Sequence, residues 1–313
     1  MTTVREKMGR VVGGKWFKRY LMVVIPAIAV FFIPKILVEY FAIGDLNFRI
    51  KEASSTLFAS RWLHFVAMFV LFEVVGIYIV VSGWMMRRIF LTVPERLAVY
   101  GVEFAVLTVA TILLIFDLIS GQSMAGSNMI GAGNMEGALK GYVVHLTQSN
   151  AFDALTVMHV IFTTGSVAYT LTAISNYAIS GIFEDRTEDN SVIEERREAF
   201  YRTLYASTAL LTVGVLQLAA WLGLPTDNIE QKEEFTKLVT AMTIYLSMLF
   251  TLIAIVSAYL SASCFNRSVS VSVPDRKRRE ELQIKIFDRK MIISMFLPAI
   301  AGYLVKLVPL LFA

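Results

Sequence analysis

The residues with most chemical potential in this sequence are ionisable side chains inside long apolar runs. Glu73 lies near the middle of one run, Glu103 lies two turns into the next, and Asp117 follows on nearly the same helix face as Glu103. A charge at the bilayer centre costs roughly 2.5–3.5 kcal/mol or more, so such residues usually serve an ion, a proton or a partner side chain. For Glu73, binding of a proton or cation and a hydrogen bond to a neighbouring helix are equally favoured. For Glu103 the hydrogen bond is favoured.

Two further runs carry polar residues at steps of three or four, which places them on one helix face. In the fourth run these residues are Asp153, Thr156, His159, Thr163, Ser166 and Thr170. In the sixth they are Thr236, Thr240, Thr243, Ser247, Thr251, Ser257 and Ser261. Small and hydroxyl residues allow close approach of membrane helices, and the same residues can line a hydrated pathway. The first interpretation is slightly favoured, and both remain open.

The three histidines are His64, His145 and His159, and all fall toward the same side of the predicted bilayer. With nearby carboxylates they are weak candidates for a metal site, a proton relay or a bis-histidine haem site. No two of them share a ligand spacing on one helix, so a stabilising network of lysines and carboxylates is favoured. The sequence therefore assigns no cofactor.

The elements that must position these residues are seven long apolar runs. The 313 residues are 56% hydrophobic and 17% charged, with a mean hydropathy of +0.63, whereas soluble domains carry about a quarter charged residues. A run of roughly 20 apolar residues is long enough to cross the hydrocarbon as a helix. We therefore predict an all-α, polytopic transmembrane bundle with spans near 18–41, 62–86, 97–119, 151–183, 203–224, 236–265 and 291–313.

The loops between these runs alternate in basic content. The first 19 residues hold six Lys or Arg, and basic residues recur in the second, fourth and sixth loops. The positive-inside rule then places the amino terminus in the cytoplasm and the carboxyl terminus outside, with the first run as an uncleaved span. The net charge of +4 is read as this orientation signal rather than as a nucleic-acid surface. A plasma membrane or bacterial inner membrane is the expected location.

Two loops have unusual composition. The third, 120–150, is rich in glycine and has Lys140 as its only basic residue, so it is either a flexible outer loop or a re-entrant element. On the cytoplasmic side we predict that 184–202 extends the fifth span as a helix. We also predict a charged helical stretch after Pro274.

These features favour a channel or transporter-like protein for an ion or small solute. Its pathway would be lined by the two hydroxyl stripes, and Glu73 would be its charged element. The alternative is a membrane-embedded scaffold or complex subunit, whose basic loops would hold a partner or anionic lipid. A redox protein with haem or metal at the outer histidines is a distant third. The lipid bilayer is the one certain partner, homo-oligomerisation stays open, and no motif of a soluble-type enzyme is present.

Overall fold

The computed structural model describes residues 14–41, 55–120, 151–182, 190–224, 226, 230–285 and 288–311, and within these ranges every extended regular element is an α-helix. Side chains at 31–41, 55–59, 113–120, 151–163, 222 and 304–311 are outside this description. The helices are α2 (Lys15–Phe41), α3 (Ser55–Phe90), α4 (Val93–Ser120), α6 (Ala151–Gly181), α7 (Asn190–Gly223), α8 (Lys232–Ser272), α9 (Arg276–Leu282) and α10 (Arg289–Leu311). The glycine-rich segment 121–150 lies outside the described residues.

Local sequence signals set several helix ends. Thr92 precedes α4, and both its backbone N–H and its hydroxyl donate to Glu95 Oε2, at 2.8 and 2.7 Å. This resembles a capping box, with the glutamate three residues after the cap satisfying groups that the helix leaves unbonded. Asp275 caps α9 by accepting from the backbone N–H of Lys277. The predicted charged helix after Pro274 is thereby confirmed, and the predicted extension before the fifth span is helical from Asn190 onward.

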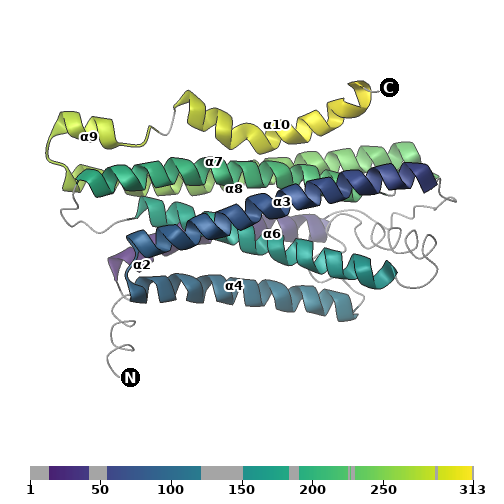
Figure 1. Ribbon diagram of the computed structural model, residues 1–313, viewed down its shortest axis with the longest axis horizontal. Coiled ribbons are helices and arrows are strands. Elements are labelled where there is room, and N and C mark those ends of the chain that lie inside the picture. Colours follow the sequence, from purple (N-terminus) through teal and green to yellow (C-terminus); the bar gives the residue numbers. More distant parts are fainter. Residues whose placement is uncertain are drawn as a thin grey trace.

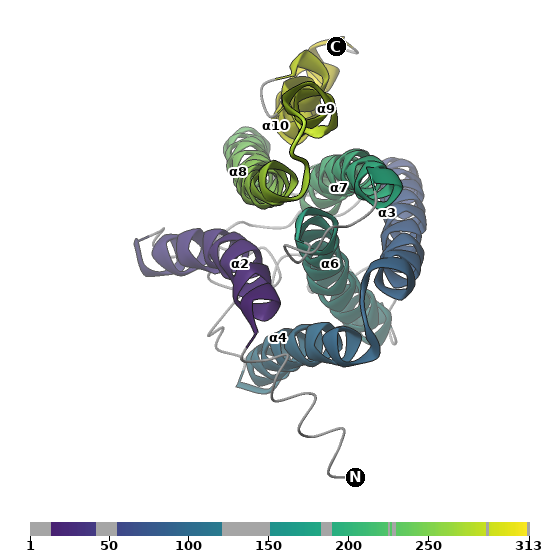
Figure 2. The same ribbon diagram turned by 90° about the vertical axis from the view of Figure 1, so that its left-hand side faces the viewer.

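The long helices run side by side, and α6 occupies the middle of the bundle (Figures 1 and 2). It contacts α2, α3, α4, α7 and α8, whereas α10 packs outside α7 and α8. The largest buried cluster joins α2, α6 and α8 and includes Tyr20, Ile179 and Ile253. Tyr169 belongs to a second cluster between α3, α6 and α7. Residues 171–181 of α6 are almost all buried by neighbouring helices.

Large apolar side chains also cover the outer surface, chiefly on α3, α4, α8 and α10. Val74, Phe104 and Ile293 are more than half exposed, as lipid contact requires. Among the described residues, three segments are long and apolar enough to cross a membrane: Ser60–Phe90, Asn190–Trp221 and Lys232–Ser272. These findings support a membrane protein. The predicted total of seven spans and the cytoplasmic amino terminus stay predictions.

Glycines allow unusually close helix contacts at two places. A β-carbon added to Gly302 of α10 would lie closer than 3.0 Å to Ser247 of α8, and one added to Gly181 of α6 would lie that close to Ser261. Ser261 also donates its hydroxyl hydrogen to the carbonyl oxygen of Tyr177 on α6. Part of the α8 hydroxyl stripe therefore serves helix packing at both contacts.

Candidate functional site

Glu73 lies near the centre of the α3 span and meets Tyr169 of α6. The Tyr169 hydroxyl donates to Glu73 Oε2 at 2.5 Å, so one oxygen of the carboxyl group has a partner. The other oxygen, Oε1, is buried and has no hydrogen-bond partner among the described residues. An unsatisfied carboxyl oxygen away from water carries a large desolvation cost unless a proton, a cation or a water molecule binds it.

Two glycines make room for this pair. A β-carbon on Gly76 would lie closer than 3.0 Å to the Tyr169 ring, so the ring can lie flat against α3 only because this position is glycine. A β-carbon on Gly165 would lie 3.5 Å from Glu73 Oε1, which is ordinary contact. The Tyr169 ring also packs against Phe72, with centroids 5.7 Å apart. The tyrosine is thus held in place, while the space beside Oε1 stays open by the width of a methyl group.

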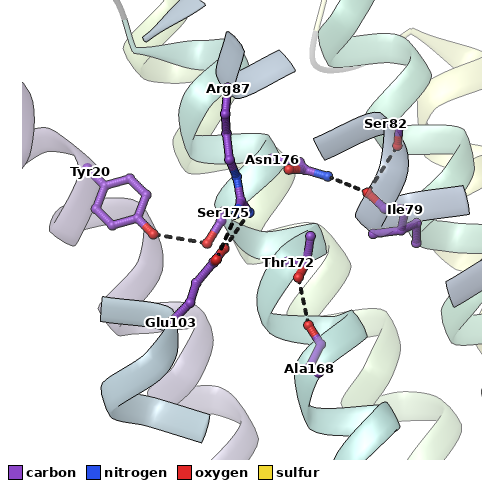
Figure 3. Close-up of polar contacts among 9 residues, drawn as sticks. All are labelled: Tyr20, Ile79, Ser82, Arg87, Glu103, Ala168, Thr172, Ser175 and Asn176. Atoms are coloured by element: carbon purple, nitrogen blue, oxygen red, sulfur yellow. Dashed lines mark hydrogen bonds and ion pairs between the residues drawn. The ribbon is translucent and has the colours of Figure 1, made fainter. Parts of the chain in front are cut away.

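A second charged pair lies toward the basic end of the bundle, which we define as the end carrying Arg87, Arg196 and Arg289. Arg87 of α3 binds Glu103 of α4 through two hydrogen bonds, Nη1 to Oε2 at 2.8 Å and Nη2 to Oε1 at 2.5 Å (Figure 3). Their side chains are only 5% and 15% exposed. The Arg87 guanidinium also lies 5.0 Å from the centre of the Tyr100 ring.

Glu103 is joined to further helices by a short polar chain. Ser175 of α6 shares a hydrogen bond of 2.9 Å with the Tyr20 hydroxyl of α2 (Figure 3). The Ser175 hydroxyl also interacts with the Glu103 carboxyl group. About two turns of α3 nearer the centre than Arg87, Asn176 donates to the carbonyl oxygen of Ile79 at 3.3 Å. Because Arg87 binds both carboxyl oxygens of Glu103, this network is suited to holding α2, α3, α4 and α6 together.

Arg196 holds the end of α6 at the same basic end. Its guanidinium donates to the carbonyl oxygens of Ile179 and Ile182 at 3.0 and 3.3 Å, and to that of Phe90 at 3.3 Å. The last carbonyls of a helix have no intrahelical partner, so a buried arginine can replace the missing donors. The sequence placed Arg196 in the predicted cytoplasmic helical extension 184–202 and gave no sign of this contact.

The hydroxyl stripe of α8 is buried and bonded within its own helix. Thr243, Ser247 and Thr251 are 4% exposed or less, and they donate to the carbonyl oxygens of Val239, Ile244 and Ser247 at 2.7 to 2.8 Å. On α6, Ser166 and Thr170 are partly buried. This arrangement is what helix packing requires, and a pathway along the stripes stays a prediction.

Most of the remaining predicted site residues have side chains outside the described structure, so their grouping stays a prediction. Asp117 lies on α4, and Asp153, His159 and Thr163 lie on α6, but their side chains fall outside the described residues, as does all of His145. His64 is exposed on α3. Among the described side chains, no group of three or more histidine, cysteine, aspartate or glutamate residues has the arrangement of a metal site.

Sequence reasoning missed several buried polar groups in the bundle. Gln217 of α7 is fully buried, and neither its amide nitrogen nor its amide oxygen has a hydrogen-bond partner in the described part of the chain. The hydroxyls of Tyr245 and Thr212 share this condition. A lone glutamine in an apolar run was the available signal for Gln217. A tyrosine such as Tyr169 gives no comparable signal, because tyrosine is also common in lipid-facing positions.

No protein-family model matches this sequence, and comparisons with curated proteins and with solved structures find no match either. The geometry around Glu73 is therefore the basis on which a function can be assigned.

Proposed function

We propose that this membrane protein translocates a small cation or a proton, and that Glu73 is the group that binds it. The observation that carries the proposal is the buried oxygen Oε1 of Glu73, which has no partner among the described residues, while Oε2 is held by Tyr169. Near the middle of a membrane span, such an oxygen is a binding group with an open position. The unbonded amide of Gln217 adds a second polar group inside the bundle.

In this proposal Glu103 does not bind the translocated cation or proton. Both of its carboxyl oxygens bind Arg87, so its charge is already compensated by a protein group. Arg87 lies 14 positions beyond Glu73 along α3, which corresponds to about 21 Å of helix. The two carboxyl groups thus lie at different depths and have different partners.

Replacement of Glu73 by Gln is expected to reduce flux in proteoliposomes to the level of protein-free liposomes. Glutamine keeps the size of the side chain and an acceptor for Tyr169, but it cannot bind a proton or carry a negative charge. The measurement is the rate of internal pH change, followed with an entrapped pH-sensitive dye, under an imposed proton gradient, or under a K⁺ or Na⁺ gradient with a protonophore present so that protons move in compensation for the cation. Flux by the Glu73→Gln protein at the wild-type rate would show that Glu73 is not the binding group.

Replacement of Gly165 by Ala is expected to lower the same flux without unfolding the protein. The added methyl would lie 3.5 Å from Glu73 Oε1, close enough to cover this oxygen and far enough to avoid a clash. Tyr169→Phe is the companion variant, because it keeps the ring but removes the donor to Oε2. A hydrogen bond to a charged group is worth about 1.5–3 kcal/mol, so its loss should change the affinity of Glu73 for the translocated ion by roughly tenfold or more. Wild-type flux in Gly165→Ala, with wild-type thermal stability, would mean that Oε1 is not used.

The second candidate is a membrane scaffold or complex subunit without a pathway. It is favoured by the α8 stripe, where Ser247 lies against Gly302 and its hydroxyl bonds its own helix. A scaffold predicts no flux above that of protein-free liposomes for the wild-type protein under any of the gradients. The same assay therefore separates the two functions.

A further inference from the structure

The segment that joins α8 to α10 is fixed to the basic end of the bundle. The Asn266 side-chain amide donates to the carbonyl oxygen of Ile284 at 2.9 Å and accepts from its backbone N–H at 2.7 Å. Arg197 of α7 donates to the carbonyl oxygen of Glu281 at 2.9 Å. Leu282 and Ile284 are almost fully buried in the cluster between α7, α8 and α10. These contacts give the segment a defined position.

Most arginines of α9 are used inside the protein. Arg278 binds Glu194 and Glu281, and Arg276 binds Glu280. Arg279 donates to the carbonyl oxygens of Val273 and Pro274. These groups stabilise the connection, so they are not available to hold a ligand without losing an existing bond.

The three cations that follow α9 make no such side-chain bonds within the described residues. Lys285, Arg289 and Lys290 are exposed, and their side chains have no acidic partner among the described residues. Asp288 is the acidic residue between them and is exposed too. The three cations and one acid leave a net charge of +2 at the start of α10.

Helix α10 becomes lipid-facing directly after these cations. Ile292, Ile293 and Phe296 are 36%, 51% and 46% exposed, whereas Met291 and Met295 on the opposite face pack in the cluster that contains Phe200 and Leu204. The outward face of this helix is therefore basic at its start and apolar beyond it.

Another helix places a cation at the same depth. The Arg88 guanidinium lies 3.8 Å from the centre of the exposed Trp84 ring on α3. Thr203 of α7 donates to Met86 Sδ at 3.6 Å, and Leu204 beside it belongs to the cluster of Met291 and Met295. Since tryptophan and arginine gather at headgroup depth, the start of α10 lies at that level as well.

We propose that an anionic phospholipid binds at the start of α10. Its headgroup phosphate would contact Lys285, Arg289 and Lys290, and its acyl chains would lie along Ile292, Ile293 and Phe296. Free phosphate would use only the cations, and nucleic acid would not use the apolar face. The cations Arg289 and Lys290 and the exposed apolar residues after them lie on the same helix, and this arrangement favours a lipid. This proposal does not depend on the role of Glu73.

The test is a titration of the detergent-solubilised protein with phosphatidylglycerol and with phosphatidylcholine, followed by native mass spectrometry. The wild-type protein is expected to bind phosphatidylglycerol more tightly. In Arg289→Gln/Lys290→Gln the affinity should fall by roughly thirtyfold, because each of the two cations near a lipid surface contributes about 1 kcal/mol. The matched control is Lys232→Gln/Lys237→Gln. It removes the same charge from the first turns of α8, at the end of that helix away from α9 and the start of α10, and should bind phosphatidylglycerol like wild type.

Four results would overturn the lipid site. The first three are equal affinity for the two lipids, wild-type affinity in Arg289→Gln/Lys290→Gln, and the same loss in the control variant. The fourth is displacement of the lipid by inorganic phosphate at millimolar concentration, which would show a simple anion site. Thermal melting of each variant confirms that it is folded before the titration.

Discussion

Replacement of Arg87 by Leu is expected to lower the free energy of unfolding by about 3–5 kcal/mol, which is a large part of the stability of most folded proteins. The guanidinium makes two hydrogen bonds to Glu103, and both side chains are largely buried. Without Arg87, Glu103 would remain as an uncompensated charge among α2, α4 and α6. The loss of the Arg87–Tyr100 contact adds to the effect.

The double variant Arg87→Leu/Glu103→Leu is expected to regain most of this stability. Replacing both members of a buried ion pair by apolar residues is often neutral or stabilising, because no charge then remains to be desolvated. The control is Arg202→Ala, which removes an exposed pair with Glu198 and should cost less than about 1 kcal/mol. The measurement is unfolding by sodium dodecyl sulfate in mixed micelles, followed by circular dichroism. A cost for Arg87→Leu no greater than that for Arg202→Ala would contradict the structural role of the pair.

The polar residues inside apolar runs were the part of the site that the sequence could predict. Glu73 and Glu103 were both recognised by their cost in lipid, and the structure describes both at helix contacts. Their partners could not be predicted in the same way. Arg87 adjoins the predicted span 62–86 and was counted as a loop cation, although the helix continues to Phe90 and turns this side chain inward. Hydropathy fixes neither the end of a helix nor its rotation, and both decide which side chains meet.

The two hydroxyl stripes show a second limit of the sequence. A step of three or four residues places Thr243, Ser247 and Thr251 on one face, and the structure buries all three. The spacing cannot say whether that face meets another helix or water, because small hydroxyl residues suit both. Here the deciding residues lie on other helices, as Gly302 does against Ser247. Contacts of this kind depend on tertiary arrangement and carry no local signal.

Replacement of Gly181 by Ala is expected to destabilise the bundle although it adds only one methyl group. The new β-carbon would lie closer than 3.0 Å to both the hydroxyl and the backbone carbonyl oxygen of Ser261. A side chain can rotate away, but a backbone oxygen can move only if α6 and α8 separate. Overpacking of this kind costs about 1–3 kcal/mol, and loss of the hydrogen bond from Ser261 to Tyr177 would add about 1 kcal/mol.

Gly101→Ala is the matched control, because a β-carbon at this position of α4 meets no atom within 4 Å. There the same change should be neutral or stabilise by up to about 1 kcal/mol, since alanine favours the helix more than glycine does. Adding Ser261→Ala to Gly181→Ala removes the hydroxyl but leaves the backbone oxygen, so it should restore only part of the stability. Full restoration would show that the serine side chain alone sets the distance between the two helices. Partial restoration is expected because the α6 and α8 backbones are in direct contact, and this requires glycine at 181.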